Sequence, residues 1–426
     1  MLAEAARAGT RTTANERAAT RVLAAILVTA LLLQRIGLEI GTSYLSVVGP
    51  IGFLIAGYGL LQGTLAFHRT RSIIFIAFVG WMIAGGAIRA ALPDHYGTDP
   101  SWMSLSQFVA LTGFGTLVLA EPVEESRFFD MVSGVLLALA LAGLLQFVVQ
   151  FAGISLFSFS AFIPARWLLE GPYANLIPIG EGGYFKSNGL FLVEPSVFSQ
   201  FMALAIIVEM LMFRRPLRLA CFAAGLVASV SGTGWLMIIA FVVTAAFSLG
   251  GRGLLLSGAT LLVALFGLGG LAAVFPSAFD FFIGRSDEIY AIGSSGHQRF
   301  ITPWWLADFV LSRTPWAALY GIGAGVSEHL GMQPPWDYNL NPPVKITLEY
   351  GFPCFALYLW FLVAGRKTGT QKALVAPILV LLLLTGGYQQ FPPVLFPAML
   401  LVMTADLVPA RTVLGRARPA ATAVPG

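Results

Sequence analysis

Runs of apolar residues long enough to cross a membrane follow one another along most of the chain, with short polar segments between them. A helix that crosses the hydrocarbon core of a bilayer needs about 20 apolar residues. On this criterion the pattern predicts about twelve spans. They are expected at residues 22–40, 45–67, 72–92, 103–120, 129–154, 189–213, 217–230, 235–250, 254–275, 344–364, 373–389 and 394–408. The predicted fold class is therefore an all-α polytopic membrane protein.

Basic residues determine which side of the membrane each loop occupies, because cytoplasmic loops carry an excess of Lys and Arg. With twelve spans and the N-terminus inside, most of the 25 Lys and Arg fall in short inner loops and tails. This arrangement predicts cytoplasmic tails at 1–21 and 409–426, nine spans within 22–275 and three within 344–408. The weakest pair, 217–230 and 235–250, is joined by Ser231-Gly232-Thr233-Gly234, which is either a turn or a kink. A kink would leave eleven spans and move the C-terminus to the other side.

Two long polar segments fall on the outer face, at about 155–188 and at 276–343. The second is rich in charged and aromatic residues without Ser, Gln or Lys runs, so we expect a folded periplasmic cap. Thr302-Pro303 predicts the start of a short helix in it, and the apolar residues from Trp304 onward predict an amphipathic helix on the membrane surface. The Trp residues of this face form either an interfacial belt or the lining of a sugar-binding cavity.

Composition agrees with a membrane protein and excludes several other classes. Charged residues make up 11% of the chain, against about 25% in soluble domains, and mean hydropathy is +0.80. The net charge of +4 is spread among loops, so no nucleic-acid partner is expected. Cys221 and Cys354 lie in apolar segments without metal-ligand spacing, so we predict neither a metal site nor a disulfide.

Glu194-Pro195 is the most informative polar position inside an apolar run. Proline removes a backbone donor and disfavours helix in the residue before it. The pair therefore predicts a helix break beside a carboxylate, and such breaks at membrane depth are buried in protein or line a cavity. The break is either functional or a structural kink whose carboxylate pairs with a nearby Arg.

Cations on the same face supply the other half of a candidate site. They are Arg166, Lys186, Arg285 and Arg299. Arg binds phosphate through two parallel hydrogen bonds, and Lys binds it as a point charge. Each of these residues alone is equally consistent with a solvated loop charge or a rim salt bridge; together they suit a lipid-linked diphosphate.

Several motifs resemble those of the superfamily of O-antigen ligases and O-antigen or exopolysaccharide polymerases. They are Gly189-Leu-Phe with Glu194-Pro195-Ser196, the turn Ser231-Gly-Thr-Gly234, the stretch Tyr320-Gly-Ile-Gly-Ala-Gly325, and Asn339-Leu-Asn341 followed by Glu349-Tyr-Gly351. The plan of about twelve helices with one large periplasmic loop is also similar. The resemblance extends over roughly residues 188–362.

This resemblance implies metal-independent, inverting transfer of a glycan from an undecaprenyl-diphosphate-linked oligosaccharide, in a bacterial inner membrane with both termini cytoplasmic. It implies no cofactor, a surrounding of membrane lipids, and a chain-length regulator and a flippase as partner proteins. The expected substrate-binding residues are Arg166, Lys186, Arg285, Arg299, Asn341 and Trp304. The base remains open among Glu194, His297, His329 and Glu349.

Two departures favour a polymerase over a ligase. Ligases usually carry His-Asn where this chain has Leu340-Asn341, and often Ser-Arg where it has Ser231-Gly232. A ligase that transfers polymer to lipid A core or protein is the first alternative. A secondary transporter or flippase that uses the break at Glu194-Pro195 is the second, and the absence of inverted repeats argues against it.

Overall fold

The structure, a computed structural model, is mostly helical and describes residues 2–40, 43–91, 99–120, 123–154, 163–169, 177–179, 183–274, 284, 290–292, 294–331, 340–365, 368–384 and 391–407. The first group of helices is α1 (Leu2–Leu32), α2 (Val48–Leu61), α3 (Arg69–Ala90), α4 (Trp102–Gly113), α5 (Glu125–Val149), α6 (Pro195–Met212), α7 (Pro216–Ala228), α8 (Thr233–Ser248) and α9 (Gly250–Val274). The second group is α11 (Ser295–Phe300), α12 (Thr302–Arg313), α13 (Ala317–Tyr320), α14 (Val326–Gly331), α15 (Pro342–Tyr350), α16 (Phe352–Val363), α17 (Gly369–Ala373), α18 (Val375–Leu384) and α19 (Phe391–Asp406).

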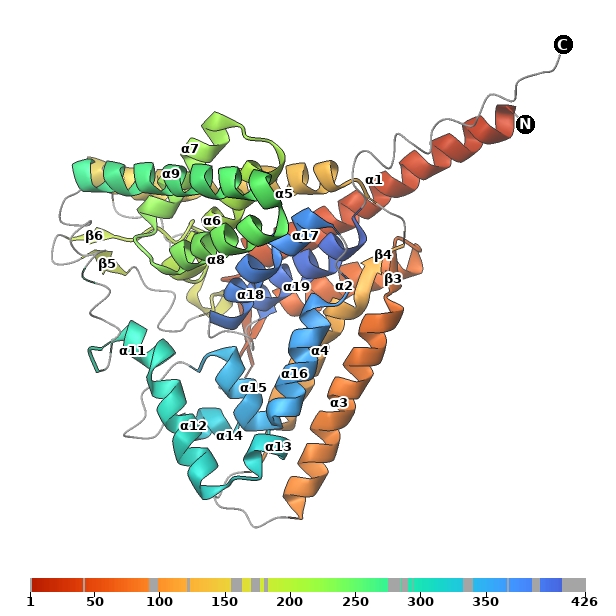
Figure 1. Ribbon diagram of the computed structural model, residues 1–426, viewed down its shortest axis with the longest axis vertical. Coiled ribbons are helices and arrows are strands. Elements are labelled where there is room, and N and C mark those ends of the chain that lie inside the picture. Colours follow the sequence, from red (N-terminus) through yellow and green to blue (C-terminus); the bar gives the residue numbers. More distant parts are fainter. Residues whose placement is uncertain are drawn as a thin grey trace.

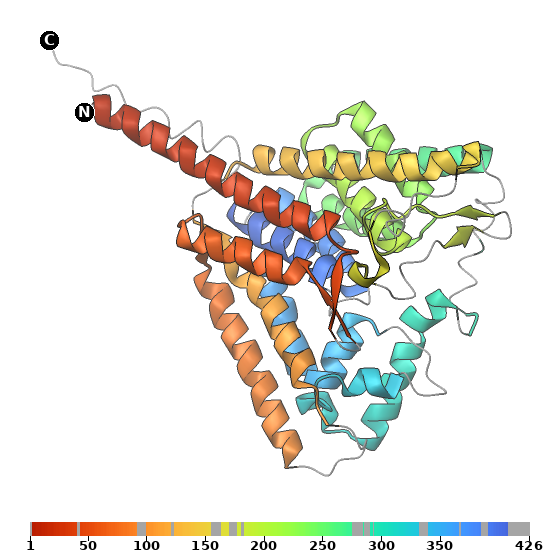
Figure 2. The same cartoon turned by 180° about the vertical axis from the view of Figure 1, so that it is seen from behind.

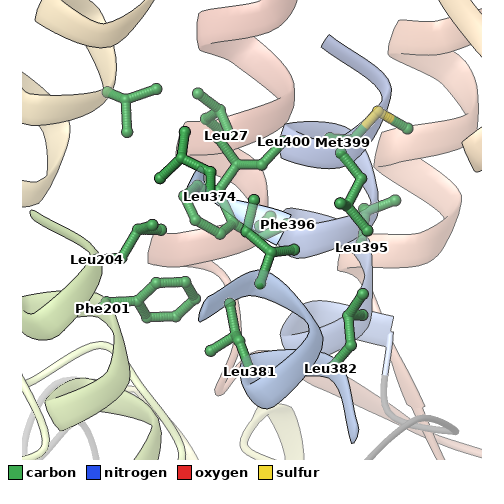
Figure 3. Packing of buried hydrophobic residues seen from close by; sticks show 14 of the residues in the cluster. Leu27, Phe201, Leu204, Leu374, Leu381, Leu382, Leu395, Phe396, Met399 and Leu400 are labelled. Carbon is green, nitrogen blue, oxygen red and sulfur yellow. The ribbon is translucent and has the colours of Figure 1, made fainter. Parts of the chain in front are cut away.

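Helix α6 is the centre of the main bundle. Nearly all of its residues are buried, as expected of a helix that is apolar on every side. Helices α5, α7 and α8 pack against it, and α9 packs along α7 and α8 (Figure 1). On its other side α6 meets the C-terminal helices, where Phe201 and Leu204 contact the cluster formed with Leu381, Phe396 and Leu400 (Figure 3). The core of the bundle therefore joins the middle of the chain to its C-terminal third.

The segment between α9 and α15 folds into short helices with a hydrophobic cluster of its own. Its buried residues are Leu306, Val310, Ala317, Ile322, Val326, Leu340, Val344 and Leu348. This second cluster packs α12, α13 and α14 against α15, and α13 also contacts α3. The expectation that this part of the chain folds, with a short helix after Thr302-Pro303, is confirmed for the described residues.

Four helices of the described chain are long and apolar enough to cross a membrane, namely Arg69–Ala90, Glu125–Ala152, Pro195–Met212 and Gly250–Gly270. Shorter apolar helices are found at Val48–Leu61, Pro216–Ala228, Thr233–Ser248, Phe352–Val363 and Gly369–Leu383. The chain is thus a helical membrane protein. The number of twelve spans and the side of the large loop stay predictions.

Three antiparallel strand pairs correct the expectation of a purely helical chain. They are β1 (Gly37–Ile40) with β2 (Ser43–Ser46), β3 (Leu65–Phe67) with β4 (Leu117–Leu119), and β5 (Pro178–Ile179) with β6 (Tyr184–Phe185). The predicted spans 22–40 and 103–120 were therefore too long. In the first, α1 ends at Leu32, just before a polar Gln-Arg pair, and strand β1 follows (Figure 2). In the second, α4 ends at Gly113.

One predicted span is two helices. Helices α15 and α16 together replace the predicted span 344–364 and meet at Gly351, whose φ of 87° lies in the left-handed region. A Cβ at this glycine would overlap the backbone carbonyl of Leu319, so no other residue fits there without movement. The apolar pattern missed this break although Gly351, followed by Pro353 in the first turn of α16, is a local signal for it.

Candidate active site

The predicted break before α6 is present. Glu194 has an extended backbone, with φ −138° and ψ 150°, and Pro195 occupies the first turn of the helix. Residues 186–193 before it are not helical, and Gly189 and Leu190 have φ values of 72° and 65°. A carboxylate therefore lies at the start of the most buried helix of the bundle, on a segment held in an unusual backbone conformation.

Two glutamines one helical turn apart hold this segment, Gln146 on α5 and Gln150 directly after the end of α5. The Gln146 side chain donates to Asn188 Oδ1 at 2.9 Å and accepts from the Ser187 hydroxyl at 2.9 Å and the Leu190 amide at 3.3 Å. Gln150 Oε1 accepts from the Phe185 amide at 2.8 Å. Sequence reasoning missed both glutamines, although a pair of amides on one face of an apolar helix is a usable signal.

Arg35 approaches the same segment from the end of α1. It is buried, and its guanidinium donates to the Leu190 carbonyl oxygen at 3.4 Å. Burial lowers the pKa of Arg35 from its ordinary value. The conformation of residues 186–194 is thus fixed from two sides.

The Ser231-Gly-Thr-Gly234 motif joins two separate helices, since α7 ends at Ala228 and α8 begins at Thr233, while the number of membrane spans stays a prediction. The Thr233 hydroxyl donates to the Ser196 carbonyl oxygen at 3.0 Å, and the Gly234 amide donates to Ser199 Oγ at 3.1 Å. A Cβ at Gly234 would overlap the Ser199 carbonyl. The turn therefore packs directly on the first turn of α6, next to Glu194.

Arg299 brings the large loop to Glu194. Its guanidinium lies 3.2 Å from Glu194 Oε2, and the side chains are 13% and 14% exposed. The two residues are 105 positions apart in sequence. The Ser196 hydroxyl donates to the same carboxylate oxygen. Arg299 Nε is buried without a hydrogen-bond partner among the described residues, so the guanidinium keeps donor capacity beyond the ion pair.

The surroundings of α11 position Arg299. Asn341 caps α15 by accepting from the Val344 amide at 3.1 Å, and its amide nitrogen donates to the Arg299 carbonyl oxygen, also at 3.1 Å. His297 is buried, with Nδ1 2.9 Å from the Thr302 hydroxyl and its ring at 5.0 Å from that of Trp305. Thr302, expected as the cap of α12, instead lies in its first turn and faces His297. The contacts of Asn341 and His297 hold the backbone around Arg299.

Glu349 and His329, the other two candidate bases, are not part of the ion pair between Glu194 and Arg299. Glu349 is buried, accepts from the Ser327 hydroxyl at 2.5 Å and lies 3.9 Å from the ammonium of Lys345. Such contacts suit a carboxylate that ties α14 to α15. His329 is exposed on α14. Glu194, at the start of α6, is paired with Arg299 of the 276–343 segment.

The other residues that were expected to bind substrate differ in burial and in the element that carries them. Lys186 is buried directly after strand β6, and its main-chain amide donates to the Ile177 carbonyl at 2.9 Å. Arg166 is exposed on a 3₁₀ turn at Ala165–Trp167, and Trp304 is 59% exposed on α12. Arg285 lies outside the described residues. The β5–β6 hairpin and α11 lie on the same side of the molecule in both views (Figures 1 and 2).

No group of three or more His, Cys, Asp or Glu side chains among the described residues is arranged to hold a metal ion. The Glu194 carboxylate, the Arg299 guanidinium and the Ser196 hydroxyl are the charged and hydroxyl groups that contact one another at this site.

Residues 102–327 match the model of a family described as WcaD colanic acid polymerase. The matched range includes the two glutamines, Lys186, Glu194, the turn before α8, and Arg299. No curated protein and no solved structure gives a significant match.

Proposed function

The chain belongs to the WcaD colanic acid polymerase family, and we propose that it joins undecaprenyl-diphosphate-linked oligosaccharide repeat units into a polysaccharide on the periplasmic face of a bacterial inner membrane. The family supports polymerisation of repeat units in polysaccharide synthesis. We propose the Wzy-type reaction, with direct displacement of the lipid diphosphate and inversion at the anomeric carbon. The family match favours this function over ligation or transport.

The observation that carries this proposal is the ion pair between Glu194 and Arg299. In the reaction, an acceptor hydroxyl attacks the anomeric carbon, the bond from that carbon to the diphosphate oxygen breaks, and the diphosphate leaves with the bonding electrons. Negative charge grows on the leaving group, and a preorganised cation stabilises it. Arg299, whose Nε has no hydrogen-bond partner among the described residues, and Lys186, which lies on the segment before Glu194, are proposed for this role without a metal.

The hydroxyl of the acceptor loses its proton as it attacks, and a positioned carboxylate can accept that proton. Glu194 is proposed as this base. Inversion places the incoming hydroxyl and the leaving diphosphate on opposite faces of the sugar, so Arg299 is proposed to leave its ion pair with Glu194 for the diphosphate when the donor binds. The Ser196 hydroxyl orients the carboxylate. His297 and Asn341 are proposed as positioning residues that act through Arg299, and Glu349 as a structural carboxylate.

The test is polymer formation in cells that lack the chromosomal gene and carry a plasmid copy. Glu194→Gln and Arg299→Ala are expected to abolish long-chain polysaccharide, with a loss of at least about a hundredfold, as is typical when general acid–base catalysis or a charge-stabilising donor is removed. Arg313→Ala is the matched control, since Arg313 is an exposed cation of the same loop that lies over the Phe309 ring. Normal polymer in both Glu194→Gln and Arg299→Ala would overturn the proposal.

A further inference from the structure

A cavity of about 600 Å³ lies between α5, α7 and α9, outside the site described above. Almost all of its lining is apolar. Leu144 and Phe147 come from α5, and Phe266, Gly267 and Gly270 come from α9. The floor is α7, from Pro216 to Ala228. Phe266 and Ala224 are exposed at its edges, so the cavity is a groove that opens to the side of the bundle.

One end of the groove meets the segment that carries Lys186 and Glu194. The Ser187 amide donates to the carbonyl oxygen of Ala228, a lining residue, at 2.9 Å. Gln150, which accepts from the Phe185 amide, lies one turn beyond the lining residue Phe147. From this end the groove follows α7, whose 13 residues span roughly 18 Å at 1.5 Å per residue.

Small residues keep the groove open. Ala220, Ala223 and Ala224 form one wall on α7, and the opposite part of α9 presents Gly267 and Gly270. A Cβ at Gly270 would meet no atom within 4 Å, whereas a Cβ at Gly267 would lie 3.3 Å from Val227. The space beside Gly270 therefore belongs to the groove and is not filled by the protein.

We propose that this groove binds the polyisoprenoid chain of the lipid-diphosphate donor. The inference rests on the proposed function, because the groove begins where that function places the diphosphate. A chain that extends from a diphosphate near Lys186 continues along an apolar surface, and the lateral opening admits it from the bilayer. A chain of several isoprene units makes more contacts with the groove than a chain of two units, so it is expected to bind more tightly.

The test compares two donors that carry the same oligosaccharide diphosphate, one on a long polyprenyl chain and one on two isoprene units. Purified wild-type protein is expected to have a KM for the long donor at least about tenfold lower. Gly270→Leu fills the groove and is expected to remove that preference by raising the KM for the long donor only. Gly269→Leu is the matched control on the same helix, since a Cβ at Gly269 also meets nothing within 4 Å and Gly269 does not line the groove.

A second variant tests the groove if the Gly270→Leu protein does not fold. Ala224→Phe, which obstructs the groove from its exposed wall on α7, is expected to give the same loss of preference. Equal KM values for both donors in the wild type, or an unchanged long-donor KM in both groove variants, would overturn the lipid-groove inference. If wild-type protein forms no polymer from either donor, it is the proposed function that fails.

Discussion

Two buried glutamines, Gln146 on α5 and Gln200 on α6, have opposite surroundings. The side-chain oxygen and nitrogen of Gln146 together make four hydrogen bonds to residues 187–190. Both polar atoms of the Gln200 side chain are buried without a hydrogen-bond partner in the part of the chain that the structure describes. An unpaired buried amide costs free energy, while a paired one leaves its partners unsatisfied when it is removed. Replacement of Gln146 and replacement of Gln200 should therefore have different effects on the free energy of unfolding.

We expect Gln146→Met to lower the free energy of unfolding by about 1–3 kcal/mol and to reduce polymer formation, because the segment before Glu194 loses its support. Gln200→Met keeps the shape and removes the unpaired amide, so its thermal midpoint should be unchanged or higher. Thermal unfolding of the purified variants in one detergent checks both. A midpoint of Gln200→Met as low as that of Gln146→Met would contradict this account.

At the scale of elements, the turn between α7 and α8 offers two glycines with different constraints. Gly234→Ala places a methyl group against the Ser199 carbonyl and forces α8 away from α6, at a cost of about 1–3 kcal/mol. At Gly232 a Cβ meets nothing within 4 Å and φ is −75°, so Gly232→Ala should be tolerated. Thermal midpoints of the two variants are the measurement. Equal midpoints would show that the turn is not closely packed on α6.

Local chemistry explains which elements the sequence predicted. The break at Glu194-Pro195, the Ser231–Gly234 turn and the helix after Thr302 follow from proline and glycine, whose backbone preferences act within a few residues. The strand pair β3–β4 depends on segments far apart in sequence, so periodicity could not reveal it. Apolar composition alone does not distinguish one long span from two short helices.

The candidate site, like the fold, was predicted in part from the sequence. Charge distribution placed Glu194, Lys186 and Arg299 on one expected face, and the structure brings Glu194 and Arg299 together. The proposal of one base among four residues needed the contacts of each, because Glu349 contacts Ser327 and His297 contacts Thr302. Arg285 falls outside the described residues, and its role stays a prediction.

At the scale of the whole molecule, the proposed topology places Arg252 in the cytoplasm and Ser312 of α12 in the periplasm. Both positions are exposed, so single cysteines there can react in a background where Cys221 and Cys354 are replaced by Ala. In cells with a permeabilised outer membrane, an impermeant maleimide should label Ser312→Cys. Arg252→Cys should react only after the inner membrane is disrupted. The reverse pattern would invert the topology and remove the site from the periplasmic face.

The two hydrophobic clusters of the fold have a consequence for the candidate site. Glu194 belongs to the bundle around α6, while Arg299 precedes the helices that share the cluster on α15. The two clusters are joined through α15, because its Ile346 and Tyr350 belong to the bundle cluster and its Val344 and Leu348 to the second one. A substitution that loosens α15 is therefore expected to disturb the distance between Glu194 and Arg299 without touching either side chain.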